Sequence, residues 1–355
     1  MHRLVLVLAL SSVFAACGKD TKSSNPNPNP NVDAPPLSGA AHTIMWGPIT
    51  VQPGVEDTQC IWMKLDNAGE IKVHQMDNNL GPTSHHLIVY KDDMDTTEQT
   101  TPVACQPFVG ALNTTGMIDP IAITQKKMDE ITLPDGVAYT FAANQMIKLE
   151  LHYINSSDQT PMDASAMVTF YEADPSTIQN EASILFTGSP DIGSCTGCTA
   201  INPGAMATLH EYFTVPSDID LSTSHIFAIT GHEHRYGTDV TVNVAPAQTG
   251  PMTAVYAPDP FVWSEPITAT SDPGFSIPQG GGLDFTCTWT NTGTAAVAFG
   301  ESANDEMCFF WMYYYPSQGS KVCVHTVQYG GVNGYDLCCP DAASQGICDL
   351  ITSKF

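Results

Sequence analysis

The stretch HIFAITGHEHRYGTDVTVNVA, residues 225–245, shows the pattern that decides the fold of this chain. Its two ends are short runs of β-branched and apolar residues, and a polar segment containing glycine separates them. Runs of this kind, bounded by turn-forming residues, are typical of β-strands. The same character recurs in HLIVYK (86–91), MIKLELHYI (146–154), AMVTFYEA (166–173), LDFTCTWTN (283–291) and CFFWMYYYP (308–316). No stretch has a sustained 3.6-residue period between helix caps, so the sequence predicts an all-β protein.

The length of the chain predicts more than one domain. From about residue 39 it is too long for one average domain, and two domains of roughly 150 residues each are expected. Two tandem antiparallel β-sandwiches suit the short strands and frequent turns. We place these domains at 39–180 and 181–355, with the boundary after FYEADPS, near 175–185. No internal repeat is visible.

The N-terminus reads as an export signal followed by a tether. Arg3 precedes the apolar run LVLVLAL (4–10), which is too short to span a membrane, so residues 1–16 are predicted to be a signal peptide. The sequence Ala-Ala-Cys17 resembles the lipobox of bacterial lipoproteins, although Phe14 departs from the usual leucine-like residue. Residues 17–38, with the tract KSSNPNPNPNVDAPP, are then a lipidated Cys17 and an extended linker. We expect an outer-membrane or cell-surface lipoprotein, touching the membrane only through this anchor, or else a periplasmic or secreted protein.

Charge and cysteine content restrict the function further. The net charge is -25, from 12 Lys+Arg against 37 Asp+Glu, which argues against binding DNA or RNA. Eleven cysteines in an exported chain indicate disulfides, and ten remain once Cys17 is set aside. Cys195-Thr-Gly-Cys198 is expected to form a local disulfide or to pair with other loops, because no second CxxC stands at zinc-finger spacing. Two more disulfides, with the pairing open, are expected among Cys323, Cys338, Cys339 and Cys348. The sequence indicates no oligomeric state.

Five histidines lie on runs that read as buried strands. His232 and His234 are two residues apart, so on a strand both imidazoles face one side, which is a favourable metal-site geometry. Adjacent His85 and His86 can reach one metal only at a bulge or a strand start. His152 lies on an alternating strand. For each of these histidines taken singly, the alternative is a core or half-exposed strand histidine that binds no metal.

Four motifs together resemble a known family. They are SHHLIVY (84–90), LELHYIN (149–155), TGHEHRYG (230–237) and ANDEMCFFWMYYYP (303–316). In this order and at this spacing they resemble the type II copper, ascorbate-dependent monooxygenases, a family that includes the peptidylglycine hydroxylating enzyme and dopamine β-monooxygenase. The resemblance extends over about residues 55–325. It implies two jelly-roll sandwiches of eight to nine strands.

The resemblance also implies site residues. One copper would be held in the first domain by His85, His86 and His152. The second would be held in the other domain by His232, His234 and Met307, which would carry catalysis. Electrons from ascorbate would pass from the first copper to the second across the gap between the domains, and O2 would react at the second. A thioether is soft and favours Cu(I), which suits this role, whereas a lone Met in an aromatic strand is otherwise core filler.

Cysteines near the motifs match the family too. Cys287 and Cys308 fall where the family has a disulfide beside the methionine ligand. Cys60, in EDTQCIWMKL (56–65), matches a half-cystine of an early strand. Cys105 is expected to be disulfide-bonded as well.

The substrate is indicated only in outline. Peptide-amidating relatives grip a carboxylate with an arginine before the H-x-H and polar residues after the methionine, whereas Thr230, Phe309 and Trp311 stand at those positions here. Without an arginine on that strand the bidentate carboxylate clamp is missing. The run CFFWMYYYP suggests an apolar, aromatic pocket and therefore a small apolar or aromatic substrate, hydroxylated at a C–H bond.

Two other function classes stay open at this point. One is a copper-binding or electron-transfer lipoprotein of the same fold that does not hydroxylate. The other is a surface sandwich that binds carbohydrate or protein.

Glu233 should point away from the two flanking histidines, and His225 should lie on the opposite face of its strand from His232. The histidines expected to be purely structural are His42, His74, His210 and His325.

Overall fold

A computed structural model describes residues 39–106, 117–193, 195–329, 332–341 and 348. The described residues form strands almost throughout, with one 3-10 turn at Pro175–Thr177, which confirms the all-β prediction. In that part of the chain no helix has the length and apolar character needed to cross a membrane. The predicted signal peptide (1–16), the lipidated Cys17 and the linker (17–38) lie outside the described residues.

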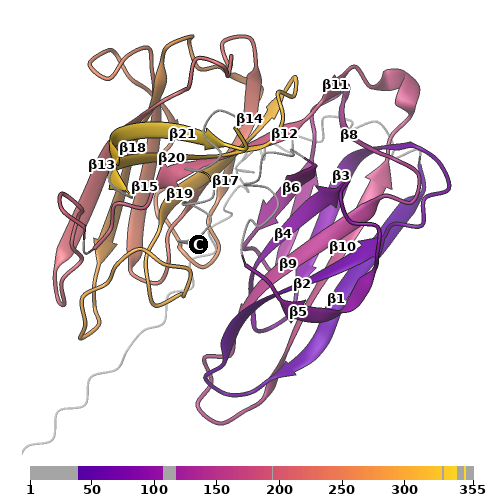
Figure 1. Ribbon diagram of the computed structural model, residues 1–355, viewed down its shortest axis with the longest axis horizontal. Coiled ribbons are helices and arrows are strands. Elements are labelled where there is room, and N and C mark those ends of the chain that lie inside the picture. The colour runs from indigo at the N-terminus through magenta and orange to yellow at the C-terminus, as the bar shows by residue number, and fades with distance from the viewer. Residues whose placement is uncertain (1–38, 107–116, 194, 330–331, 342–347, 349–355) are drawn as a thin grey trace, which may run out of the picture. The chain divides into compact units, whose positions relative to one another are not determined.

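The first half of the chain contains two sheets, shown in indigo to magenta in Figure 1. One has the order β1 (Ala41–Val51), β10 (Met162–Glu172), β3 (Ile71–Leu80), β8 (Val137–Phe141) and β11 (Asn180–Glu181), with β7 (Met128–Thr132) also paired to β3. The other has the order β5 (Gln99–Ala104), β2 (Glu56–Lys64), β9 (Met146–Ile154), β4 (Ser84–Asp92) and β6 (Ile118–Thr124). Trp46 of β1 is fully buried and donates its indole N–H to the Gln59 carbonyl of β2 at 3.2 Å, so the two sheets pack face to face.

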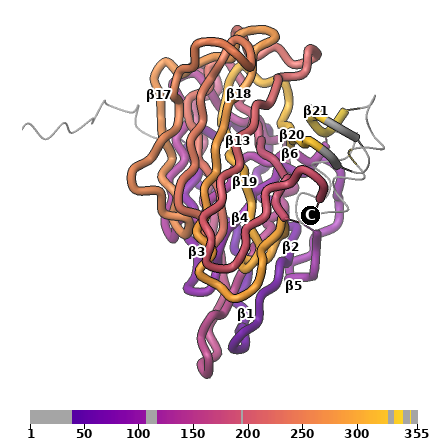
Figure 2. Tube along the Cα trace, turned by 90° about the vertical axis from the view of Figure 1, so that its left-hand side faces the viewer, coloured from indigo at the N-terminus to yellow at the C-terminus, as the bar shows by residue number. Residues whose placement is uncertain are grey.

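The second half contains two more sheets. One has the order β17 (Thr268–Phe275), β14 (His225–His232), β19 (Cys308–Tyr315), β12 (Ser183–Ser189), β20 (Lys321–Tyr329) and β21 (Val332–Cys339). The other has the order β13 (Met206–Thr214), β18 (Gly282–Thr290), β15 (Gly237–Ala245) and β16 (Thr253–Tyr256). Phe285 of β18 and Phe310 of β19 meet edge to face, with ring centroids 5.4 Å apart. In Figure 2 the antiparallel pair β20 and β21 lies side by side.

The residues of β19, CFFWMYYY, are apolar without alternation because both faces of the strand are buried. Phe310, Met312 and Tyr314 belong to the core of the second half. Phe309 and Trp311, which point to the other face, belong to a cluster that includes residues of the first half such as Ile123. A strand buried on both faces reads as a continuous hydrophobic run.

The two halves share no strand, because each of the four sheets draws on one half alone. The apolar cluster around Trp311 nevertheless contains residues from both halves, and residues 37–355 form one compact unit. The division into domains 39–180 and 181–355 stays a prediction.

All ten cysteines among the described residues are paired. The bonds are Cys60–Cys105, Cys195–Cys198, Cys287–Cys308, Cys323–Cys338 and Cys339–Cys348. The pair 287–308 is the one that the family resemblance implied, and Cys60 and Cys105 prove to be each other's partners. The CxxC closes locally, and the adjacent Cys338 and Cys339 bond to different partners.

Candidate metal centre

His85, His86 and His152 come together at the junction of β4 and β9. The pairing of these strands shifts register between Ser84 and His86, which is a bulge at the very start of β4. The bulge lets two adjacent histidines face the same space, which a regular strand would forbid. All three histidines are buried, and nitrogen atoms of the three lie within 4.8 Å of one another. The strand-start geometry expected from the sequence is therefore present.

The free ring nitrogens of this group suit a metal ion. His152 donates from Nε2 to the Glu56 carboxylate at 2.9 Å, so its Nδ1 is turned toward Nδ1 of His86, 3.4 Å away. Nε2 of His85 is buried without a hydrogen-bond partner among the described residues. Buried polar atoms normally have partners, and a carboxylate behind a ligating imidazole is the usual support for a metal ligand. The donor set therefore fits a metal ion.

The protonation of these histidines favours ligation. Burial lowers the pKa of both His85 and His86 well below 6.5, and the neighbouring His152 lowers each further. His85 and His86 are therefore neutral at pH 7, as metal binding requires. Burial opposes ionisation of Glu56, but its hydrogen bonds from His152 and from the Ala303 N–H lower its pKa to about 2. Glu56 is thus a fixed negative charge behind the histidine group.

His232 and His234 form a second group at the end of β14. The strand ends at His232, so His234 lies just beyond it, yet the two rings remain neighbours with centroids 5.0 Å apart. His232 donates from Nδ1 to the Gln125 side-chain oxygen at 2.9 Å, and His234 donates from Nδ1 to the Asp305 carbonyl at 3.3 Å. Both contacts leave Nε2 as the ligating atom. Burial lowers the pKa of His232 well below 6.5 and that of His234 to about 4.

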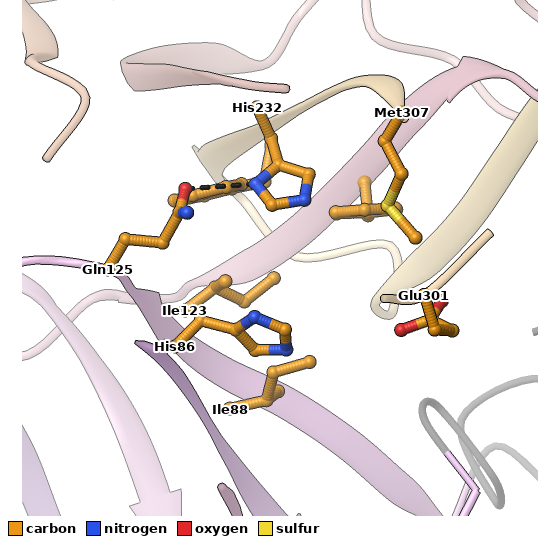
Figure 3. A pocket seen from close by; sticks show the side chains of 9 residues that line it. His86, Ile88, Ile123, Gln125, His232, Glu301 and Met307 are labelled. Carbon is orange, nitrogen blue, oxygen red and sulfur yellow. Dashed lines mark hydrogen bonds between the residues drawn. The ribbon is translucent and has the colours of Figure 1, made fainter. Parts of the chain in front are cut away.

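Met307 stands immediately before β19 and is 3% exposed. Figure 3 shows its thioether and the His232 ring directed into the same recess. Behind them lies the fully buried Glu306, whose carboxylate accepts the backbone N–H groups of His234 (2.9 Å) and Tyr236 (2.7 Å). Burial raises the pKa of Glu306 to about 7. This carboxyl group holds the H-x-H segment against the segment that carries Met307.

The two ligand groups are adjacent in this structure. The ring centroids of His85 and His234 are 6.2 Å apart, and so are those of His86 and His232. The family resemblance implied a gap between the two copper sites, whereas the structure places the five histidines in one cluster. Glu56 accounts for part of this proximity, because it also accepts hydrogen bonds from Ser302 Oγ (2.9 Å) and Ala303 N (2.7 Å).

A narrow recess opens beside both groups, with a cavity volume of about 20 Å³. Its walls are largely apolar, as the sequence predicted, although the aromatic run contributes only Trp311. Phe309 is buried in the core and stacked on Phe186, and Thr230 is hydrogen-bonded to Thr268. The described residues that line the recess are His86, Ile88, Ile123, Gln125, Phe186, His232, Glu301, Met307 and Trp311.

Three residues beside the ligands could not be assigned a role from the sequence: Glu56, Gln125 and Glu301. Glu56 lies in EDTQCIWMKL, where only the cysteine matches the family. Glu56 stands at the start of this strand, and carboxylates are rarely buried without a partner. This position was the one sequence signal for a supporting role. Gln125 and Glu301 lie in connecting segments and carry no sequence signal, because their roles depend on which loops meet.

The remaining histidines among the described residues have partners other than a metal group. His42, His210 and His325 pair with carboxylates, and His74 bonds a backbone carbonyl. His225 is exposed and stacks on Tyr315 at the far end of β14 from His232. Glu233 is fully buried but does not line the recess.

Comparison with known proteins agrees with one part of this description. Residues 185–335 match the family model described as copper type II ascorbate-dependent monooxygenase, C-terminal domain. The match contains His232, His234 and Met307. No curated protein sequence matches the chain.

Solved structures that align with the chain include two unrelated kinds of protein. One is an infectious bursal disease virus structure (Gt strain; 10% identity, 88% of each chain, TM-score 0.13). The other is the oxalate decarboxylase–formate complex of Lactobacillus farciminis (8% identity, 84% of this chain and 88% of that one, TM-score 0.15). Scores this low carry no information about the fold or function of this chain.

Proposed function

We propose that this protein is a copper-dependent monooxygenase. The proposal is supported by the match of residues 185–335 to the family model of the copper type II ascorbate-dependent monooxygenase C-terminal domain. The protein would hydroxylate a C–H bond of a small apolar or aromatic molecule with O2 and ascorbate or an equivalent reductant. The observation that carries the proposal is the convergence of two buried ligand groups on one apolar recess.

Each ligand group suits one copper ion. His85, His86 and His152 would hold the first, and His232, His234 and Met307 the second. Imidazole binds copper in both oxidation states, and the thioether favours the reduced ion. Bound copper would supply the redox chemistry that lets O2 attack an unreactive C–H bond.

The surrounding residues of the chain would orient and shield this centre. Glu56, Gln125 and the Asp305 carbonyl each accept a hydrogen bond from one ligating ring, which fixes its orientation and tautomer. The side chains of Ile123 and Trp311 line the space beside His232 and Met307. Apolar walls would exclude bulk water and hold a hydrocarbon part of the substrate near the second ligand group.

A passive copper-binding or electron-transfer protein of the same fold is the alternative. The recess beside Met307 favours the enzyme, because a carrier needs no substrate space there. The five disulfides are compatible with export. We retain the lipid anchor at Cys17 and an outer-membrane or cell-surface location as part of the proposal, with a small molecule and no nucleic acid as partner.

The test is ascorbate-dependent oxygen consumption by the copper-loaded protein over a panel of small aromatic and aliphatic compounds. Met307→His should still bind Cu(II), because imidazole binds copper well, but should lose most of the oxygen consumption. Met128→His, at a methionine that is 77% exposed, is the matched control and should behave as wild type. A protein that consumes no oxygen with any reductant and substrate would be the passive binder.

The missing carboxylate clamp gives a second arm to this test. Glycine-extended peptides should be poor substrates compared with small aromatic or aliphatic compounds, because β14, which leads into the H-x-H, carries no arginine that could bind the peptide carboxylate. Efficient amidation of such a peptide would refute the assignment of substrate class and leave the copper chemistry standing.

A further inference from the structure

The disulfide Cys195–Cys198 differs from the other four in exposure and in the length of chain that it closes. Neither of its cysteines is buried, whereas each of the other four bonds contains at least one cysteine that is 0% exposed. Its half-cystines are 3 residues apart in the sequence, and the other separations are 9, 15, 21 and 45 residues. A short loop restricts the unfolded chain least, so this bond stabilises the fold least. Its position instead leaves it open to thiols from outside the molecule.

A buried carboxyl group lies directly beside this disulfide. Asp191, two residues after the end of β12, is 1% exposed, and its Oδ1 is 3.9 Å from Cys198 Sγ. An oxygen of Asp191 and the sulfur atoms of Cys195 and Cys198 all lie within 4.8 Å of one another. The carboxyl group accepts hydrogen bonds from Thr326 Oγ1, at 2.8 Å, and from the Val327 N–H, both on β20. These bonds hold it where a sulfur that leaves the disulfide would meet it.

The surroundings of Asp191 favour its protonated form. Burial raises the pKa of this carboxyl group, and although the hydrogen bonds from β20 oppose the rise, the nearby Glu211 of β13 adds to it. His325 of β20 also acts on Asp191 and lowers its pKa. His325 lies between Glu211, at 3.1 Å, and Asp336 of β21, at 2.7 Å. A carboxyl group with a raised pKa can give a proton to a departing thiolate and take it back when the bond forms again.

We infer that Cys195–Cys198 is a redox-active disulfide that exchanges with an external dithiol, with Asp191 as proton donor and acceptor. The inference goes beyond the proposed function and does not depend on copper. A thiolate of the dithiol attacks Cys195 Sγ, because Cys198 is the sulfur beside Asp191. This attack forms a mixed disulfide and breaks the Cys195–Cys198 bond, and Asp191 gives its proton to the departing Cys198 sulfur.

The second thiol of the dithiol completes the exchange. Its thiolate attacks the partner's own sulfur in the mixed disulfide, which releases Cys195 as a thiolate and leaves the partner as a disulfide. Solvent then returns protons to Cys195 and to Asp191. Two electrons and two protons have passed from the dithiol to the cysteine pair. The reverse sequence restores the bond, with Asp191 taking the proton of Cys198.

Reduction of the folded protein tests the exchange itself. The full chain is equilibrated with dithiothreitol at graded ratios of reduced to oxidised reagent, treated with iodoacetamide and mapped by peptide mass spectrometry. Cys195 and Cys198 should be alkylated together while the other four disulfides stay intact and the circular dichroism spectrum is unchanged. Cys198→Ser, treated with oxidised glutathione, should form a mixed disulfide at Cys195. A Cys195–Cys198 bond that opens only together with the buried disulfides would overturn the inference, and so would a Cys195 thiol that forms no mixed disulfide.

The pH dependence of the reduction rate tests the role of Asp191. The rate constant per dithiothreitol thiolate should fall as the pH rises through the pKa of Asp191, because the carboxyl group then lacks the proton that it donates. Asp191→Asn should reduce about 100-fold more slowly at low pH and should show no such fall. Thr326→Val removes a hydrogen bond that stabilises the carboxylate, so it should move the fall to higher pH. This variant tests the role even where Asp191→Asn does not fold.

A matched control and the contrary results complete the design. Asp218→Asn, at an exposed carboxylate of the same half, should keep the wild-type rate and profile. A fall that persists unchanged in Asp191→Asn, or that does not move in Thr326→Val, would refute proton transfer by Asp191. Two cysteines that are reduced selectively, but at a rate that neither variant changes, would likewise exclude Asp191 from the exchange.

Discussion

Glu56 offers the sharpest perturbation of the first ligand group. Its carboxylate accepts hydrogen bonds from His152 Nε2 at 2.9 Å, Ala303 N at 2.7 Å and Ser302 Oγ at 2.9 Å. Glu56→Gln keeps the shape but replaces one oxygen by a donor and removes the charge. Hydrogen bonds to charged groups contribute about 1.5–3 kcal/mol each. Because Gln retains one acceptor oxygen, we expect the loss of one such bond, which lowers the free energy of unfolding by roughly 1.5–3 kcal/mol.

The effect on metal affinity should be confined to one group. Removing a supporting carboxylate typically weakens a metal site by about 10–100-fold, which corresponds to roughly 1.4–2.8 kcal/mol. Titration of the copper-free protein with Cu(II) against a competing chelator should show this loss at the His85/His86/His152 group, with the second binding step unchanged. Asp57→Asn, one residue along the same strand, is the control, because Asp57 bonds no histidine. Unchanged affinity at the first step, or equal loss at both, would refute the role given to Glu56.

Three further predictions follow from other contacts. Gln125→Ala removes the acceptor for His232 Nδ1 and should weaken the second copper about 10–100-fold by the same reasoning, measured by the same titration. Burial opposes protonation of His325, but its bonds to two carboxylates raise its pKa to about 9, so it stabilises the fold fully below pH 6.5 and progressively less as the pH rises through 9. Chemical unfolding between pH 6.5 and 10 should show a loss of at most about 3 kcal/mol that His325→Asn abolishes; a pH dependence that persists in the variant would contradict the assignment. Tyr313→Phe leaves the buried N–H of Ile123 without its acceptor at 3.1 Å and should cost about 1–2 kcal/mol with no change in copper content, whereas a lost copper would mean that this contact supports the metal centre.

The sequence was sufficient where short-range pattern decides structure. Alternation and turn residues predicted the strands, and the pair His85-His86 required a bulge or strand start, which β4 provides. The H-x-H was only partly anticipated, because β14 ends at His232 and a hydrogen bond to the Asp305 carbonyl, not strand geometry, orients His234.

The remainder of the site depends on contacts between distant segments. Gln125 reaches His232, and Ser302 reaches Glu56, over separations of 107 and 246 residues. Nothing in the local pattern around these residues encodes such pairings. For the same reason the closeness of the two ligand groups, and the partners of Cys323 and Cys339, could not be read from the sequence.

Metal analysis of the purified protein tests most directly whether two ligand groups of this chain each hold one copper ion. After loading and removal of excess metal, the wild-type chain should contain two copper ions, and His86→Ala and His232→Ala should contain one each with the fold retained. One zinc ion and no copper uptake in the wild-type protein, or two copper ions in both variants, would contradict this assignment.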